Sequence, residues 1–337
     1  MTGSRTVALS VAVLIGLAAG PAWAVVIETV PVGNPGNAGD SRYGGYGSVG
    51  YTFNIGKYEV TAGQYTEFLN AVAKTDTYGL YNPYMDYDAF PDWLGCNIKR
   101  SGSAGSYTYS VASDYANRPV NWVSWGDAAR FANWLHNGQP TGAQDLSTTE
   151  DGTYYLNGAT SDAALLAVTR KPGWKWAIPT EDEWYKAAYH KNDGVTANYW
   201  EYPTSSDAVP GRDLNDVSGN NANYYGGNPY PIQSPYYTTV VGEFQNSDSP
   251  YGTFDQGGNV WEWNETAIYY GMYPPSRGLR GGSFNYPYVT LHASGRSSND
   301  PAYELHYFGF RVSEVPEPAT VVMLALAGVG ALRRRRA

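Results

Sequence analysis

The 337-residue chain is 42% hydrophobic and 15% aromatic, enough to bury one large core or two small ones, which excludes a chain that is disordered throughout. Its formal net charge is −9, and without Arg5 and the four C-terminal arginines 17 basic side chains stand against 31 acidic ones, a charge of −14. Such a surface repels nucleic acid and anionic lipid and tolerates divalent cations, so nucleic acid is the least favoured partner.

The first 24 residues have the parts of a secretory signal. Arg5 precedes an apolar run over residues 7–19, and the segment ends in Ala22-Trp23-Ala24, a small-residue cleavage pattern. The alternative is a buried apolar N-terminal helix, which the cleavage-like end disfavours. We therefore expect residues 1–24 to be a signal peptide and the mature protein to begin near Val25.

Cys96 is the single cysteine, so no internal disulfide can form in an exported chain. We expect it to be a small buried apolar residue. The four histidines have none of the spacings of a zinc or iron site, and we expect surface or structural roles for them. They are His136, His190, His292 and His306.

Residues 25–50 are rich in Gly, Pro and Asn and predict an irregular mature N-terminus, followed by a strand-like segment at 51–55. Three helices are predicted by a capping hydroxyl with an acid or amide three residues later. The pairs are Thr61 with Gln64, Ser124 with Asp127, and Thr180 with Glu183. Glu181 and Glu183 resemble an acid–base pair, but capping and helix-dipole roles explain them better.

Long stretches between and after these helices are dense in Gly, Asn, Tyr, Ser and Pro, namely residues 78–117, 138–173 and 193–250. The chain therefore predicts an α+β fold of low regular secondary structure, with few helices and short strands. Loops of such length are usually functional or held by bound ions.

The last 24 residues, 314–337, form a tail of three parts. Pro316-Glu317-Pro318 precedes an apolar stretch over residues 319–332, and Arg333–Arg336 follow it. Fourteen apolar residues fall short of the roughly 20 that span a bilayer, which favours transient anchoring. The tail resembles the PEP-CTERM sorting signal. This resemblance implies exosortase-type sorting machinery as a partner and a place in the cell envelope, at the outer surface or in the extracellular matrix.

Six sequence blocks occur in a fixed order along residues 51–313. They are Tyr58-Glu59-Val60-Thr61, Pro119–Trp125, Ile178–Trp184, Gly258–Trp263, Arg280–Phe284 and Gly309–Val312. Together they resemble the domain of the formylglycine-generating enzyme, or sulfatase-modifying factor, family. That resemblance implies a variant of the C-type lectin-like fold with short antiparallel strands. The tryptophans of these blocks are expected in the core.

The resemblance implies a calcium site with oxygen ligands only, as a hard cation requires. Its ligands would be the carboxylates of Asp255 and Glu262 and the carbonyls of Gly258 and Val260. The alternative is that Glu262 is a buried acid paired with an arginine. A second family site would begin at Asn223 and Tyr224, but its downstream acidic partner cannot be placed in the residues that follow.

The family's oxidase chemistry uses two cysteines after the Gly-Gly-Ser turn, and here residues 284–292 contain none. Thiolates are the natural ligands of copper(I), so the sequence argues against copper and offers no catalytic residue. Trp261, Ser283 and Arg296 match residues of the family's substrate cleft, and Tyr307 stands where relatives often carry an amide. For Arg296 a structural salt bridge is an equal alternative.

The favoured hypothesis is an exported, non-catalytic binding or structural module for a peptide, protein or polysaccharide. Its 31 tyrosines suit such contacts. The alternative is an exported metal-dependent oxidase that modifies a protein side chain, as in sulfatase activation, in its weak form through His292 and His306. A third possibility is a matrix component without a defined small ligand. Iron-dependent sulfoxide synthases of the family need a histidine-rich helical domain, and nothing in the sequence supplies one.

Overall fold

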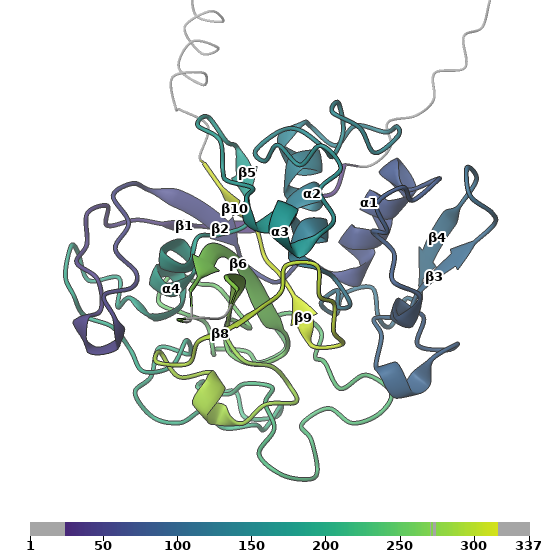
Figure 1. Ribbon diagram of the computed structural model, residues 1–337. Helices are drawn as coiled ribbons and strands as arrows, with labels where there is room; N and C mark the ends of the chain where they lie inside the picture. The colour runs from purple at the N-terminus through teal and green to yellow at the C-terminus, as the bar shows by residue number, and fades with distance from the viewer. Residues whose placement is uncertain (1–23, 270, 272–273, 316–337) are drawn as a thin grey trace, which may run out of the picture.

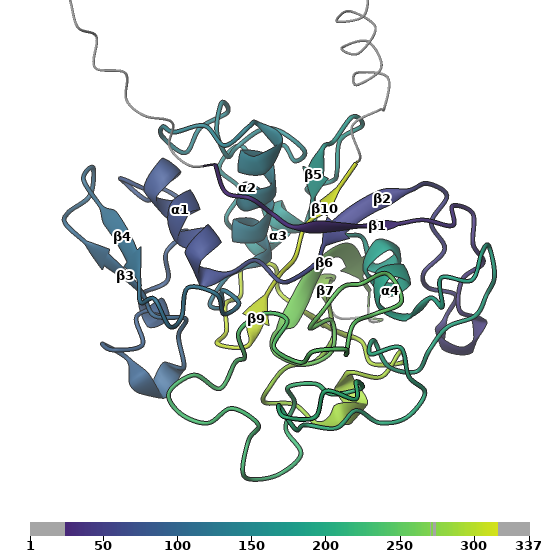
Figure 2. The ribbon, with the colours of Figure 1, turned by 180° about the vertical axis from the view of Figure 1, so that it is seen from behind.

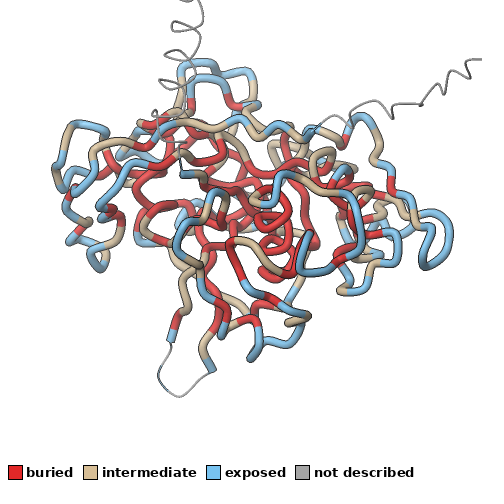
Figure 3. The backbone as a smooth tube through the Cα atoms, turned by 90° about the horizontal axis from the view of Figure 1, so that it is seen from above, coloured by how far each residue is buried: buried red, intermediate tan, exposed pale blue. Residues whose placement is uncertain are grey.

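The computed structural model describes residues 24–269, 271 and 274–315. The expected signal peptide and the sorting tail therefore lie, except for Ala24 and residues 314–315, outside the described residues. No helix in the described ranges is long and apolar enough to cross a membrane. Figure 3 shows the buried backbone concentrated in the middle of the molecule, with most of the exposed segments at its periphery.

The first sheet joins both ends of the domain. Its strand order is β1 (Thr29–Val32), β2 (Phe53–Gly56), β10 (Ser313–Glu314) and β5 (Trp176–Ala177), and all pairs are antiparallel. The expectation of an irregular segment over residues 25–50 is therefore wrong where β1 runs along β2, as Figure 2 shows. Pro31 suggested a loop, but β1 is the edge strand, where a residue without an N–H is tolerated.

The second sheet holds the sequence blocks of the C-terminal half. Its order is β8 (Ser297–Asn299), β7 (Ser276–Arg280), β6 (Trp261–Ile268) and β9 (Phe308–Gly309), with β6 and β9 parallel. The pairing of β6 with β7 is irregular between Trp263 and Ala267. The first half of β6 is buried on both faces, so this strand runs through the centre of the molecule.

Three main helices surround these strands: α1 (Ala62–Val72), α2 (Trp125–His136) and α4 (Glu181–Tyr189). Each begins with the predicted capping box, in which both reciprocal hydrogen bonds are present. A short helix, α3 (Asp162–Leu166), lies in the stretch 138–173. In Figures 1 and 2, α4 lies on one side of β6, and α1 and α2 lie on the other.

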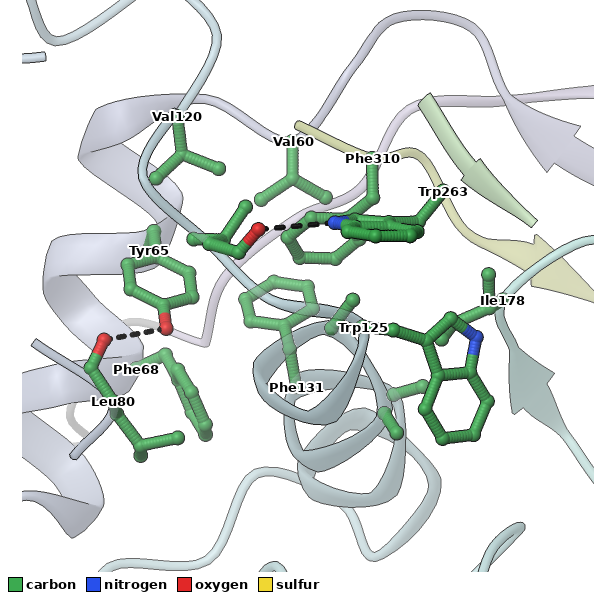
Figure 4. Close-up of a cluster of buried hydrophobic side chains, with 14 of the residues drawn as sticks. Val60, Tyr65, Phe68, Leu80, Val120, Trp125, Phe131, Ile178, Trp263 and Phe310 are labelled. Carbon is green, nitrogen blue, oxygen red and sulfur yellow. Dashed lines mark hydrogen bonds between the residues drawn. The ribbon is translucent and has the colours of Figure 1, made fainter. Parts of the chain in front are cut away.

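The main core forms where α1 and α2 meet the central strands. The rings of Phe131 and Phe310 lie 5.4 Å apart, and Phe131 also packs edge-on against Phe68 at 5.3 Å. Trp263 is fully buried, and its indole N–H donates to the Val123 carbonyl over 3.0 Å, so the polar atom of this large ring is satisfied (Figure 4). The tryptophans expected in the core, Trp122, Trp125, Trp184, Trp261 and Trp263, are all buried.

The long loops differ in their regular structure. Residues 78–117 contain two single-turn helices, η2 (Pro83–Met85) and η3 (Pro91–Trp93), and the hairpin of β3 (Ile98–Ser101) and β4 (Thr108–Val111). Two further single turns are η1 (Ser41–Tyr43) and η4 (Tyr288–Thr290). The described stretch 193–250 has no helix and no strand, and it fills the lower part of Figure 1.

The Phe131→Ala substitution should lower the free energy of unfolding by about 3 to 5 kcal/mol, because it leaves a cavity among aromatic rings that cannot all collapse into it. Denaturant unfolding checks this value. Tyr155→Ala, at a ring that is 52% exposed, is the control and should change stability by no more than about 0.5 kcal/mol. Equal effects of the two substitutions would show that the core does not lie where α1 and α2 meet.

Candidate functional site

The expected cleft residues Trp261, Ser283 and Tyr307 come together around Tyr286. The Trp261 ring packs edge-on against Tyr286 at 5.6 Å, and Tyr286 packs against Tyr307 at 5.3 Å. The Tyr286 hydroxyl donates to the Tyr307 hydroxyl over 3.3 Å. Ser283 is buried, and its hydroxyl accepts the Asn285 N–H at 3.3 Å. Aromatic side chains therefore occupy the segment in which the family carries its cysteines.

Arg296 is engaged by an acid of α4. Its Nε and Nη2 donate to the two carboxylate oxygens of Glu181, each over 2.7 Å. Arg280 binds the same carboxylate through Nε at 2.8 Å, so one buried acid holds two guanidinium groups. The structural salt bridge, one of the two roles weighed for Arg296, is thus present, and Glu181 has an ion-pairing role beyond capping.

Glu262 forms a buried ion pair at the centre of the molecule. Arg311 binds it in bidentate fashion, with Nε to Oε2 at 2.6 Å and Nη2 to Oε1 at 2.7 Å. The Trp184 indole N–H also donates to Oε2, over 2.7 Å. Asp255 lies nearby and accepts the Gly242 N–H at 2.6 Å. Burial raises the pKa of Asp255 to about 6.

Glu59, a residue of the first sequence block, belongs to the same acidic group. It is 2% exposed, and neither carboxylate oxygen has a hydrogen-bond partner. Burial, followed by the charges of Asp255 and Glu262, raises its pKa well above the ordinary value, against the opposite effect of Arg311. Three acids therefore surround one arginine, and the group carries more negative than positive charge when all its acids are ionised.

Asn223 lies against Gly258 and Asn259, which precede Glu262 in the chain. A bridge pairs Asn223 with Gly258, whose φ of +89° and close approach to the Asn223 carbonyl exclude a side chain there. The Asn223 amide donates to the Tyr237 carbonyl at 2.9 Å, and its buried Oδ1 has no partner. The Tyr224 hydroxyl donates to the Pro210 carbonyl over 2.7 Å.

In the described ranges, no three His, Cys, Asp or Glu side chains are gathered to share one metal ion.

The aromatic cleft residues continue into a row of rings, which we call the aromatic band. Each ring lies 4.4 to 6.1 Å from a neighbouring ring of the band. The band branches at His306: one branch runs through Tyr307 and Tyr286 to Trp261, and the other runs through Phe284 to Tyr237, Tyr230 and Tyr225. The members are Phe90, Tyr84, Trp93, Trp122, His306, Tyr307, Tyr286, Trp261, Phe284, Tyr237, Tyr230 and Tyr225. The band links the loop before η3 to the stretch 225–237 and has exposed rings at both ends, namely Phe90, Trp93 and Tyr225.

The backbone beneath the band is strained. Leu94, Trp122 and Tyr237 all have φ between +51° and +57°, a conformation that bulky side chains rarely adopt. Leu94 and Trp122 are linked through Trp93, which precedes Leu94 in the chain. The Trp122 indole N–H donates to the Trp93 carbonyl over 2.9 Å. Strain of this kind persists only where surrounding contacts hold it, and it concentrates at functional sites.

The two histidines suggested for a metal lie in different surroundings. The His292 Nε2 contacts Glu201 at 2.7 Å, and its ring packs between Tyr43 and Tyr202. His306 lies within the band, 4.6 Å from Tyr307 by ring centroid. Burial lowers the pKa of His306 to about 4, so its imidazole is neutral near pH 7.

A sequence profile of the sulfatase-modifying factor enzyme 1-like domain matches residues 48–315. The chain belongs to this family. A second profile, the PEP-CTERM protein-sorting motif, matches residues 314–336 of this sulfatase-modifying factor-like protein and indicates export and sorting to the cell envelope by exosortase-type machinery. No curated protein matches the chain.

Solved structures confirm the fold of this sulfatase-modifying factor-like protein. CarF is 20% identical with a TM-score of 0.51, over 87% of this chain and 99% of CarF. Treponema denticola variable protein 1 is 19% identical with a TM-score of 0.50, over 86% of this chain and 95% of that one. The C-type lectin-like α+β fold is therefore confirmed, while identities this low establish the fold alone.

Two features of the site are not predicted from the sequence: the place of Glu59 in the acidic group and the outer half of the aromatic band. Glu59 belongs to a sequence block before α1, and nothing local marks its carboxylate as buried. The aromatic residues of 84–93 were a visible signal, because Tyr84, Phe90 and Trp93 lie within ten residues. Their contact with Trp122 joins segments about 30 residues apart and is not readable from spacing.

Protonation of His306 should destabilise the protein in acid. The folded state holds the pKa of this imidazole near 4 against 6.5 in the unfolded chain, so stability is lost as the pH falls through 6.5 towards 4. At pH 4 we expect the loss from this group to be about 3 kcal/mol. Unfolding curves of the wild type and of His306→Phe across this pH range should diverge, and parallel curves would contradict the buried, neutral imidazole.

Proposed function

We propose that the protein is a non-catalytic binding module displayed by the cell envelope, which holds its ligand on the aromatic band. The observation that carries this proposal is the continuous row of rings with exposed ends. Large exposed aromatic groups on a rigid base supply contact area at little cost in conformational entropy. The outer surface or the extracellular matrix is the proposed place of this binding.

The local chemistry supports a role without oxidation. The Gly-Gly-Ser turn is followed by Phe284 and Tyr286, which contribute rings in place of sulfur. The one cysteine, Cys96, is 3% exposed and packs in the main core, and burial raises the pKa of its thiol to about 11. A thiol that keeps its proton is a poor metal ligand and nucleophile.

Incubation of the mature domain with copper or iron and a cysteine-containing peptide in air should leave the peptide mass unchanged, because no pair of thiolates stands where the family oxidises its substrate. Mass spectrometry of the peptide checks this. A peptide aldehyde would establish the alternative, an exported oxidase. The same assay with His292→Ala and His306→Ala would then show whether these histidines hold its metal.

We further propose a calcium ion beside the Glu262–Arg311 pair. The excess of buried carboxylate and the unpartnered oxygens of Glu59 support a cation there. Its ligands would be the carboxylates of Asp255 and Glu262 and the carbonyls of Gly258 and Val260, all oxygen donors as calcium requires. Glu262 already binds Arg311, so the ion would share this carboxylate with the guanidinium. When bound, the ion would neutralise charge and hold the loops together.

We propose a second ion site at Asn223 and Tyr224, with a lower affinity than the first. Asn223 Oδ1 is a buried oxygen with no partner, and the Tyr224 carbonyl would be a second ligand. The residues that follow supply no matching acid, as the sequence already indicated. An ion here would therefore depend on water and backbone carbonyls, and we expect it to bind more weakly than the ion at Asp255.

Removal of calcium with a chelator should lower the melting temperature, with a stability difference of about 3 kcal/mol when free calcium exceeds its dissociation constant a hundredfold. Asp255→Ala should abolish the calcium-dependent shift. Asp207→Ala, at an exposed acid outside the group, is the control and should retain it. Direct metal analysis of the purified domain measures the ion itself. A protein whose melting temperature is indifferent to calcium and chelator would overturn the proposal.

A further inference from the structure

We propose that the exposed ends of the aromatic band, with Trp93 at one end and the Tyr225–Tyr230 region at the other, bind the sugar rings of a neutral polysaccharide chain, and that the buried rings between them hold these ends in place. This inference rests on the proposed binding function and names the class of its ligand. A pyranose ring presents a face of C–H groups and a rim of hydroxyls. Aromatic faces with phenol hydroxyls at their edges match both features.

Trp93 is built as a fixed platform. Its indole stacks on Tyr84 with ring centroids 4.4 Å apart and planes 18° apart, while 44% of the residue remains exposed. Its carbonyl accepts the Trp122 indole N–H at 2.9 Å, which secures the single turn η3. Phe90, 39% exposed, packs edge-on against the same Tyr84. A ring held in this way loses little freedom when a sugar stacks on it.

The other end of the band borders a cavity. Its volume is about 400 Å³, and it is lined by Asn228, Pro229, Tyr230, Gln233, Ser234 and Tyr237. Tyr230 packs against the exposed Tyr225 at 5.2 Å, and its hydroxyl donates to Asn285 at 3.1 Å. The lining therefore contains two phenol rings, two side-chain amides and the hydroxyl of Ser234. Such a mixture suits a ligand with apolar faces and many hydroxyls.

The backbone along the band favours a glycan over a peptide. An extended peptide is recognised mainly through free main-chain groups at a sheet edge. Here the carbonyls along the band already accept hydrogen bonds within the fold. The Trp93 carbonyl accepts from the Trp122 indole, and the Leu94 and His306 carbonyls accept from the Asn121 amide. The Tyr307 and Tyr286 carbonyls accept from the backbone N–H groups of Trp261 and Tyr225. At its exposed ends, the band therefore offers ring faces and side-chain hydroxyls.

Charge favours a neutral chain over an acidic one. The loop that carries the platform also carries Asp86, Asp88 and Asp92, and the latter two are exposed. Lys99, on the adjacent β3, is paired with Asp88. An anionic polysaccharide would meet like charge at this end, whereas a neutral one meets none. Binding of a neutral chain should also change little between low and high salt.

The test uses the mature domain, calorimetry and a panel of neutral hexasaccharides: β-1,4-glucan, α-1,4-glucan and β-1,4-mannan. At least one should bind, its disaccharide should bind more weakly, and Trp93→Ala and Tyr225→Ala should each lower its affinity about tenfold. Trp93→Phe should restore part of the loss. Tyr155→Ala, an exposed ring outside the band, should bind as the wild type does. Melting temperatures show whether each variant is folded.

The contrary outcomes separate the two proposals. Binding of a proline-rich peptide or of an oligogalacturonate, lost in Trp93→Ala, with no neutral glycan bound, would overturn the ligand class and keep the binding function. Loss of glycan affinity in Tyr155→Ala but not in Trp93→Ala would overturn the assignment to the band. If the folded domain bound none of these probes, both the ligand class and the binding function would be contradicted.

Discussion

The buried guanidinium of Arg311 joins the two four-stranded sheets to each other and to a loop. It binds Glu262 of β6 in bidentate fashion and donates to the carbonyls of Gly56, at the end of β2, and Phe254. One side chain therefore ties both sheets to the loop that contains Asp255. Breaking such a pair leaves an unpaired buried charge, which costs far more than the pair itself contributes.

Local features of this fold were readable from the sequence. The three capping boxes involve residues only three apart, and all are present at α1, α2 and α4. Burial of the block tryptophans was also readable, because a ring of that size in a loop-rich domain has few other places. Strand β1 was missed because its pairing with β2 outweighs the local effect of Pro31 at a sheet edge.

The site was less predictable, since it depends on pairings between distant segments. Sequence spacing left Arg296 undecided between a ligand and a salt bridge, and its partner Glu181 lies 115 residues away. Glu262 likewise acquires Arg311 from the end of the domain. The aromatic band joins the stretches 84–93, 225–237 and 284–307, and only the folded chain brings these stretches together.

The acidic group and the aromatic band meet on one strand. In β6, neighbouring side chains point to opposite sides, so Trp261 enters the band while Glu262 binds Arg311. Anything that fixes the Glu262 carboxylate therefore also fixes the Trp261 ring, and through Tyr286 and Tyr307 the middle of the band. In this arrangement, buried charge sets the position of aromatic rings that themselves carry none. A family scaffold whose reactive segment holds rings in place of thiols can thus keep its rigidity, and the change from oxidation to binding is the one that we propose for it.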